Sequence, residues 1–317
     1  MRNLVTGSKY IGNGLVQIGL FVKLATFDPG SGDRIGVVDA ARGIVRDATS
    51  PLAAAGIAAD VVTVIERWGA ARAVLEGGLG SAPGFPLDSV RLRAPLRPVR
   101  NIFCVGKNYH DHVREFGRSG YDTPSRSEDI PDKPIIFSKA TTSVTGPYDD
   151  VDPHHGVTGE LDYEAELGVI IGRGGRRITR DDAYTHVWGY TIVNDVTARD
   201  LQRAHKQWLL GKSLDTHCPL GPYAVSADEA GDVQTLEVET FVNGEQRQSA
   251  AVKDLIFGIP KLIETISAGI TLLPGDIIAT GTPAGVGIGF GPPKFLASGD
   301  LVEISITRLG ALRNRIG

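Results

Sequence analysis

The sequence predicts an α+β protein that is mainly β, in which a small N-terminal α/β domain (residues 1–97) precedes a larger domain (residues 98–317). Three observations support this class. Glycine is abundant, at 40 of 317 residues, and many glycines lie in Thr-Gly, Pro-Gly and Gly-Asp pairs, which are typical of loops between strands. Several short segments have the residue pattern of strands. One alanine-rich segment, residues 52–76, has apolar residues at helical spacing.

The elements of the predicted N-terminal domain follow an extension at residues 1–20. Residues 21–27 alternate as a strand, a Pro- and Gly-containing turn follows, and residues 34–38 form the return strand of a hairpin. Residues 52–76 then supply one or two helices. The proline-containing run 94–98 marks the predicted boundary with the larger domain.

The larger domain is predicted to contain most of the strands. The expected strands are residues 100–106, 134–139, 161–172, 187–195, 236–242, 276–280 and 301–307. The expected helices are residues 107–116, 197–210 and 256–268. Residues 118–133 are polar and have little to bury, so they predict a mobile surface segment that acts as a lid.

Composition excludes several classes of partner. The net charge is -4, and no basic stripe is present, which argues against a nucleic-acid partner. The apolar stretch 11–20 is short and broken by glycines, so neither a membrane span nor a signal peptide is predicted. Cys104 and Cys218 have no metal-ligand or redox spacing, and a cytoplasmic location is the expectation.

Two acidic side chains one residue apart stand out in segment 161–172. In a strand, Glu164 and Glu166 point to the same face, with their Cα atoms about 6.6 Å apart. Such a pair suits a hard divalent cation such as Mg²⁺ or Mn²⁺ if the face is buried. The alternative is a solvated outer face, and the pair considered alone slightly favours that alternative.

Other polar residues give weaker signals. His112 and Glu115 share a helical face, where they would form either an oriented imidazole–carboxylate pair or an ordinary surface ion pair. Asp195 ends a predicted strand and would be either a ligand or a helix N-terminal acid.

Two further stretches carry polar or glycine patterns. In the predicted helix 197–210, Arg199, Gln202 and Lys206 are expected to face one way. The glycine-rich run 285–291 is followed by prolines instead of a helix, so it predicts a backbone that approaches another group closely, not a nucleotide loop.

Taken in order, five motifs resemble the fumarylacetoacetate hydrolase family, over about residues 100–310. The motifs are VGKNYHDH (105–112), LDYEAEL (161–167), NDVTARD (194–200), GKSLD (211–215) and GTPAGVG (281–287). The resemblance implies a mixed β-sandwich roll and a homodimer. It also favours a metal site over a solvated outer face for Glu164 and Glu166.

The resemblance assigns roles to ten side chains. It implies that Glu164, Glu166 and Asp195 bind one Mg²⁺ or Mn²⁺ ion. It implies catalytic roles for His112, Glu115 and Lys212, with the first two as a general-base pair. It implies that the substrate, a small anionic 2-oxo acid, contacts Arg199, Gln202, Lys139 and Thr282.

The function expected from these residues is that of a divalent-metal-dependent hydrolase. It would cleave a carbon–carbon bond in a 2,4-dioxo acid of acylpyruvate or fumarylpyruvate type, giving pyruvate or a related 2-oxo acid and a carboxylic acid. The alternative is an oxaloacetate-type decarboxylase or a 2-hydroxymuconate-type isomerase on the same site. A third hypothesis is a metal-dependent dicarboxylate-binding protein without turnover, and the general-base pair argues against it.

Overall fold

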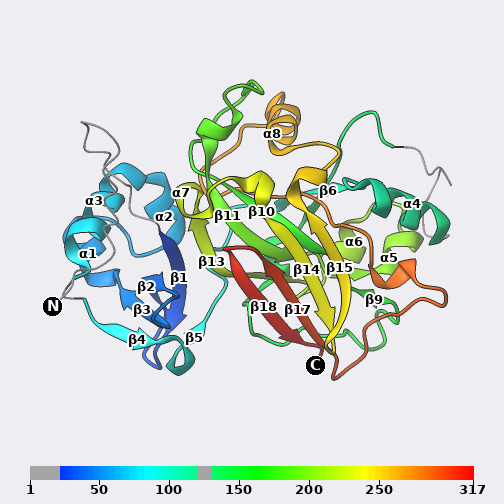
Figure 1. Ribbon diagram of the computed structural model, residues 1–317, viewed down its shortest axis with the longest axis horizontal. Coiled ribbons are helices and arrows are strands. Elements are labelled where there is room, and N and C mark those ends of the chain that lie inside the picture. The colour runs from blue at the N-terminus through cyan, green and yellow to red at the C-terminus, as the bar shows by residue number, and fades with distance from the viewer. Residues whose placement is uncertain (1–21, 81, 120–129) are drawn as a thin grey trace.

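The structure is a computed structural model that describes residues 22–80, 82–119 and 130–317 (Figure 1). The predicted extension at 1–20 and most of the predicted lid at 118–133 lie outside these residues. No helix in the described part of the chain is long and apolar enough to cross a membrane.

Strands dominate the described residues. The strands are β1 (Lys23–Asp28), β2 (Arg34–Asp39), β3 (Ile44–Asp47), β4 (Gly84–Pro86), β5 (Arg91–Leu92), β6 (Ile102–Gly106), β7 (Ile135–Lys139), β8 (Val144–Thr145), β9 (Leu161–Asp162), β10 (Ala165–Ile171), β11 (Val187–Asn194), β12 (Thr197–Ala198), β13 (Cys218–Ser226), β14 (Glu237–Val242), β15 (Glu245–Ala251), β16 (Ile277–Ala279), β17 (Leu301–Ile306) and β18 (Gly310–Arg315). The α-helices are α1 (Thr49–Ala54), α2 (Val61–Glu66), α3 (Trp68–Gly78), α4 (His110–Ser119), α5 (Arg199–Ala204), α6 (Leu209–Lys212), α7 (Ala227–Ala230) and α8 (Ile259–Ser267). This composition confirms the predicted α+β, mainly β class.

One large mixed sheet runs through the molecule. Its order is β4-β3-β2-β1-β13-β11-β10-β16-β6-β7, with β5 beside β1 and β8 beside β13. Most pairs are antiparallel, but β16 runs parallel to β6, and β8 runs parallel to β13. The path ends at β4 and β7, so this sheet does not close into a barrel.

A second sheet has the order β15-β14-β17-β18 and lies beside the central strands of the large sheet (Figure 1). Alternate residues of β10 therefore face two different cores. Leu167 and Val169 join the core that contains Val302 and Ile304 of the second sheet. Ile170 joins the core that contains the apolar residues of α1, α2 and α3. Every residue of β10 is buried for this reason.

The N-terminal strands extend the same large sheet. Strand β1 pairs antiparallel with β13, with Lys23 opposite Val225 and Leu24 opposite Ala224. Helices α1, α2 and α3 cover one face of this part, on the left of Figure 1. The predicted domain boundary at residues 97 and 98 remains a prediction.

Several predicted elements differ in detail from the observed ones. The predicted helix 197–210 is divided into α5 and α6, because Lys206 has a φ of 57° and is exposed. The prediction that Lys206 shares a face with Arg199 and Gln202 is therefore wrong. The predicted helical segment 52–76 is divided among α1, α2 and α3. Strands β13 and β18 were not predicted at all.

Candidate active site

Three buried carboxylates converge where β10 and β11 pair. Glu164 lies between β9 and β10, Glu166 lies in β10, and Asp195 directly follows β11. The antiparallel register places Ala165 opposite Asn194, so the three acids become neighbours across the two strands. One ligand oxygen from each lies within 4.8 Å of the others.

The predicted single strand 161–172 is interrupted at Tyr163 and Glu164, between β9 and β10. The Glu164 backbone still forms hydrogen bonds with the end of β11 and the residue that follows it. Its N–H donates to the Asn194 side-chain oxygen at 3.1 Å, and its carbonyl accepts from the Asp195 N–H at 2.8 Å. The solvated outer face, considered as an alternative, is wrong: Glu164 and Glu166 are buried.

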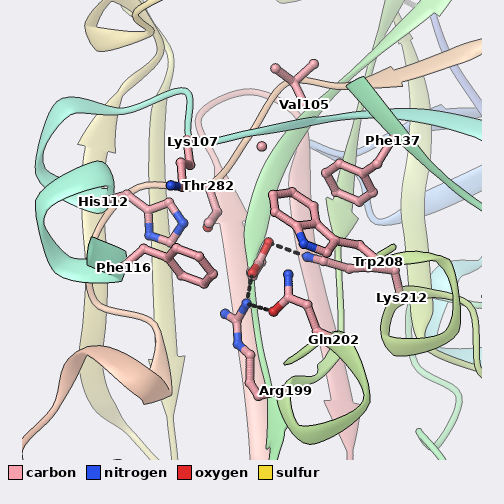
Figure 2. A pocket seen from close by; sticks show the side chains of 12 residues that line it. Val105, Lys107, His112, Phe116, Phe137, Arg199, Gln202, Trp208, Lys212 and Thr282 are labelled. Carbon is pink, nitrogen blue, oxygen red and sulfur yellow. Dashed lines mark hydrogen bonds and ion pairs between the residues drawn. The ribbon is translucent and has the colours of Figure 1, made fainter. Parts of the chain in front are cut away.

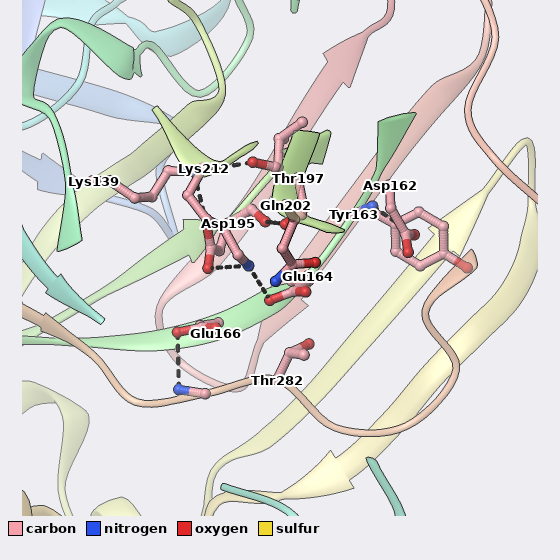
Figure 3. Close-up of polar contacts among 12 residues, drawn as sticks. Lys139, Asp162, Tyr163, Glu164, Glu166, Asp195, Thr197, Gln202, Lys212 and Thr282 are labelled. Carbon is pink, nitrogen blue, oxygen red and sulfur yellow. Dashed lines mark hydrogen bonds and ion pairs between the residues drawn. The ribbon is translucent and has the colours of Figure 1, made fainter. Parts of the chain in front are cut away.

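Three buried cations surround the carboxylates, and two of them, Lys139 and Lys212, are labelled in Figure 3. Lys212 Nζ, at the end of α6, donates to Glu164 Oε2 at 2.8 Å and to Asp195 Oδ2 at 2.7 Å. Lys139 Nζ, at the end of β7, donates to Asp195 Oδ1 at 2.7 Å. Arg199 Nη1, at the start of α5, lies 2.7 Å from Glu164 Oε1.

Glu166 is the exception among the acids. It makes no ion pair within the described part of the chain, and its Oε2 accepts only the Gly281 N–H, at 2.8 Å. Burial, followed by the charges of Asp195 and Glu164, raises its pKa well above the usual value. Burial would also raise the pKa of Glu164, but Lys212 and Arg199 outweigh it and lower that pKa to about 2.

A fourth buried acid, Asp162 of β9, completes this cluster and was not predicted as a site residue. Its Oδ2 accepts from Arg199 Nε at 2.9 Å, and its Oδ1 accepts from the Gly287 N–H at 2.6 Å. Asp162 therefore holds both Arg199 and the glycine-rich loop. The same two-residue alternation that links Glu164 to Glu166 could have identified it.

The charge balance of this cluster fits a divalent cation. The buried acids Asp162, Glu164, Glu166 and Asp195 face the buried cations Lys139, Arg199 and Lys212, which leaves one negative charge uncompensated when all are ionised. An all-oxygen donor set is what Mg²⁺ and Mn²⁺ prefer. With such an ion held by Glu164, Glu166 and Asp195, the cluster becomes net positive, which favours an anionic ligand.

The His112 and Glu115 side chains meet on α4, as the spacing predicted. His112 Nδ1 lies 3.3 Å from Glu115 Oε2, and Glu115 Oε1 accepts the Gly285 N–H at 2.9 Å. The glycine-rich loop also packs on this acid, because a Cβ at Gly289 would lie 1.8 Å from Glu115 Oε1. The close backbone approach predicted for residues 285–291 is therefore observed. The His112 side chain is only 6% exposed, so the pair is not an ordinary surface ion pair.

A pocket with about 300 Å³ of space, part of it open to solvent, brings these groups together (Figure 2). Its lining residues come from the end of β6 and the turn that follows it, α4, β7, the connection between β9 and β10, the α5–α6 region and the loop after β16. They are Val105, Gly106, Lys107, His112, Phe116, Phe137, Glu164, Arg199, Gln202, Trp208, Lys212 and Thr282.

The residues predicted to contact substrate differ in how they reach this pocket. Arg199, Gln202 and Thr282 line it, whereas Lys139 lies beneath Asp195 and contacts that acid and the Val196 carbonyl. Arg199 Nη2 is buried and has no hydrogen-bond partner among the described residues. A buried guanidinium N–H without a partner is costly, so this atom favours an anionic ligand in the pocket.

Asn108 fixes the loops that form the pocket's edge. Its side-chain nitrogen donates to the carbonyls of Phe257 and Thr280, and its oxygen accepts the Phe257 N–H. Gly281 packs against Asn108 so closely that a Cβ would lie 2.7 Å from Asn108 Cβ. This contact places the Thr282 loop beside α4.

The fold and the site define a sheet-rich protein with a buried acidic cluster that is able to hold a divalent metal beside an anion-binding pocket. Residues 101–317 match the family described as fumarylacetoacetate (FAA) hydrolase C-terminal. The chain belongs to this family.

Relatives and solved structures extend the match. Oxaloacetate tautomerase YisK of Bacillus subtilis is 55% identical over 234 residues, which cover 74% of this chain and 75% of that protein. A fumarylacetoacetate hydrolase from Exiguobacterium antarcticum matches with a TM-score of 0.78 and 41% identity, covering 93% of this chain and 99% of that chain. A maleylpyruvate hydrolase from Sphingobium sp. SYK-6, in complex with a manganese(II) ion and pyruvate, matches with a TM-score of 0.74 and 31% identity, covering 93% and 98%.

Proposed function

We propose that the protein is a divalent-metal-dependent isomerase that interconverts the keto and enol forms of oxaloacetate or of a closely related 2-oxo dicarboxylic acid. The observation that carries the proposal is the meeting of three groups at one pocket: the carboxylate cluster, which reaches the pocket through Glu164, the His112–Glu115 pair, which reaches it through His112, and Arg199 Nη2, which has no hydrogen-bond partner among the described residues. The identity to an oxaloacetate tautomerase supports this choice of reaction over the hydrolysis expected from sequence, which is unconfirmed.

Keto–enol interconversion requires removal of a proton from C3 and delivery of a proton to the C2 oxygen. A metal held by Glu164, Glu166 and Asp195 would supply Lewis-acid polarisation of the keto group, which makes the C3 proton more acidic. Arg199 Nη2 has no acceptor among the residues that the structure describes, and it binds a substrate carboxylate in this proposal.

His112 serves as the base for the C3 proton. Its Nδ1 faces Glu115, which orients the ring and leaves Nε2 for the substrate. Glu115 is held in turn by the Gly285 N–H. Lys212, which lines the same pocket, stabilises the negative charge that develops on the C2 oxygen. The enolate oxygen then takes a proton from water, which reaches the pocket through its open side, and His112 releases the C3 proton to water, so that no net proton is gained or lost. The phenyl ring of Phe116 and the indole of Trp208 border the pocket and exclude part of the water.

The test follows the exchange of the C3 protons of oxaloacetate with deuterium by NMR, with manganese-loaded protein and a chelator-treated control. We expect acceleration that the chelator abolishes. His112→Ala should lower the rate by about 100-fold or more. His110→Ala is the matched control, because His110 is exposed on the same helix, and it should leave the rate unchanged. No acceleration of exchange by the native protein would refute the proposal.

Carbon–carbon hydrolysis of a 2,4-dioxo acid is the second candidate. Two observations favour it: the His112–Glu115 pair is arranged as a water-activating base, and a maleylpyruvate hydrolase has the same fold at 31% identity. Mass spectrometry of the products separates the candidates. Two carbon fragments from an acylpyruvate support hydrolysis, carbon dioxide from oxaloacetate supports decarboxylation, and unchanged mass with deuterium incorporation supports the isomerase.

A further inference from the structure

Gly285, in the glycine-rich run 285–291, is the backbone support of the Glu115 carboxylate. Its N–H donates to Glu115 Oε1 at 2.9 Å, and the other oxygen of that acid, Oε2, lies 3.3 Å from His112 Nδ1. The φ of Gly285 is 103°, and a Cβ there would lie 1.8 Å from the Arg247 carbonyl oxygen, so no other residue fits. Glycine has the widest backbone freedom of all residues. The direction of this N–H therefore depends on the groups that contact the glycine.

Tyr163 contacts the other side of the same glycine. Its hydroxyl donates to the Gly285 carbonyl oxygen at 2.7 Å. The residue is fully buried, and burial raises the pKa of the hydroxyl above its usual value, so it stays protonated and remains a donor at neutral pH. The N–H and the carbonyl of Gly285 lie on either side of one Cα. A bond that fixes the carbonyl therefore restricts the rotation that would turn the N–H away from Glu115.

The position of Tyr163 in the chain brings it to this glycine. It lies in the break between β9 and β10, directly between Asp162 and Glu164. Figure 3 shows its ring pointing away from Glu164. Asp162 also bonds the glycine-rich run, but at the Gly287 N–H, two residues beyond Gly285. Of these two neighbours, Tyr163 is the one that fixes the glycine bound to the general-base pair.

We propose that Tyr163 is a positioning residue for the base of the reaction. Through Gly285 it keeps the Glu115 carboxylate facing His112 Nδ1, so that the ring carries its proton on Nδ1 and presents an unprotonated Nε2 to the substrate. The inference rests on the proposed function for the role of His112 as the base. Tyr163 itself does not line the pocket. Without its hydroxyl, Gly285 rotates more freely, Glu115 loses its fixed direction, and more of the ring carries the proton on Nε2, where it blocks proton transfer.

The test reads the protonated nitrogen of His112 directly, so it does not depend on turnover. Protein labelled with ¹⁵N-histidine and loaded with diamagnetic Mg²⁺ is compared by NMR with its Tyr163→Phe variant at about pH 8, where most imidazoles are neutral. His112→Ala identifies the signals of that ring. We expect the Nδ1–H form to predominate in the native protein. Its ratio to the Nε2–H form should fall by about 2- to 10-fold in Tyr163→Phe, the effect of losing one neutral hydrogen bond.

The rate of C3 proton exchange gives a second readout. Tyr163→Phe should lower kcat by about 2- to 10-fold with little change in KM, because no substrate contact is lost. In a Glu115→Gln background the same substitution should have almost no further effect, because Tyr163 acts through that acid. Full additivity of the two losses would show that Tyr163 acts elsewhere and would overturn the proposal.

Matched controls exclude a general effect of a lost hydroxyl or of lost folding. Phenylalanine keeps the ring of residue 163 in the apolar core and removes only the oxygen. Tyr190 of β11 is buried in the same core, so Tyr190→Phe removes a hydroxyl elsewhere and should change neither the ratio of the two His112 forms nor kcat. Thermal unfolding of each variant confirms that it is folded.

The ratio of the two His112 forms decides the proposal. It is overturned if the Nε2–H form predominates in the native protein, if Tyr163→Phe leaves the ratio unchanged, or if Tyr190→Phe lowers it equally. If the native protein fails to exchange the C3 protons of oxaloacetate but the ratio falls in Tyr163→Phe alone, the proposed function fails and the positioning role of Tyr163 stands.

Discussion

Replacing Glu166 by glutamine tests the charge balance of the carboxylate cluster. Its ligand oxygen lies within 4.8 Å of those of Glu164 and Asp195, and two unit charges at that distance repel by about 3 kcal/mol at an effective dielectric constant of about 20. Glutamine keeps the shape and an oxygen for the Gly281 N–H but carries no charge. Since Lys212 offsets part of the repulsion, we expect the metal-free variant to be more stable than the native protein by about 1–3 kcal/mol.

Differential scanning calorimetry measures this effect directly. After treatment with a chelator, Glu166→Gln should unfold roughly 2–6 °C above the native protein. Added Mn²⁺ should reverse the order, because an ion at 1,000 times its Kd stabilises the native protein by about 4 kcal/mol and the variant lacks one ligand. Glu237→Gln, which neutralises an exposed acid on β14, is the control and should change neither value.

The pH dependence gives a further check on the same variant. The pKa of Glu166 is raised in the folded state above its ordinary value of 4.5, so the unfolded state releases its proton first as pH rises. Below about pH 4, Glu166 is protonated in both the folded and the unfolded state, so it does not lower the free energy of unfolding. As pH increases, only the unfolded state loses the proton at first, and the metal-free native protein becomes less stable. The advantage of Glu166→Gln should grow over that range. A variant that is less stable at every pH and retains the Mn²⁺-induced rise would refute the reasoning.

Three further substitutions test the surroundings of the site. Glu115→Gln should lower kcat by about 10- to 100-fold with little change in KM, measured by C3 proton exchange, and an unchanged kcat would exclude its role in orienting the base. Asp162→Asn leaves the buried Arg199 with one acid fewer and should reduce the free energy of unfolding by about 3 kcal/mol in urea titrations; a change near zero would contradict the pairing. Gly289→Ala should reproduce the kcat loss of Glu115→Gln, because the added Cβ collides with that carboxylate, whereas Gly291→Ala, where a Cβ meets nothing, should not; equal effects of the two would argue against the contact.

Local patterns in the sequence predicted much of the site. The two-residue period of a strand placed Glu164 and Glu166 together, and the three-residue spacing on a helix paired His112 with Glu115. Both patterns depend only on the geometry of one element. Asp195 joined the cluster only through the resemblance to a family, because its position depends on the register between β10 and β11.

The features that were missed depend on tertiary packing. The alternation around Glu164 and Glu166 favoured a solvated face because it is typical of a half-exposed strand, whereas β10 is buried on both faces. The break between α5 and α6 comes partly from the left-handed conformation of Lys206. It also comes from close packing of the two helices at Gly211, where a Cβ would lie 2.6 Å from the backbone nitrogen of Gln202. Strand β13 has no polar alternation, since all of its residues are buried.

The pairing of β1 with β13 bears on how this protein can be divided. The family match begins at residue 101, after the strand that covers the outer side of β13 at Ala224 and Val225. A shortened chain that starts there would leave backbone N–H and C=O groups of β13 unpaired at a sheet edge. It would also expose the adjacent apolar face, which α1, α2 and α3 cover in the intact chain. An unpaired strand edge of this kind readily forms hydrogen bonds with a strand of another chain. In the intact chain, β1 occupies this edge of β13, so the edge is not open to a strand of a second copy.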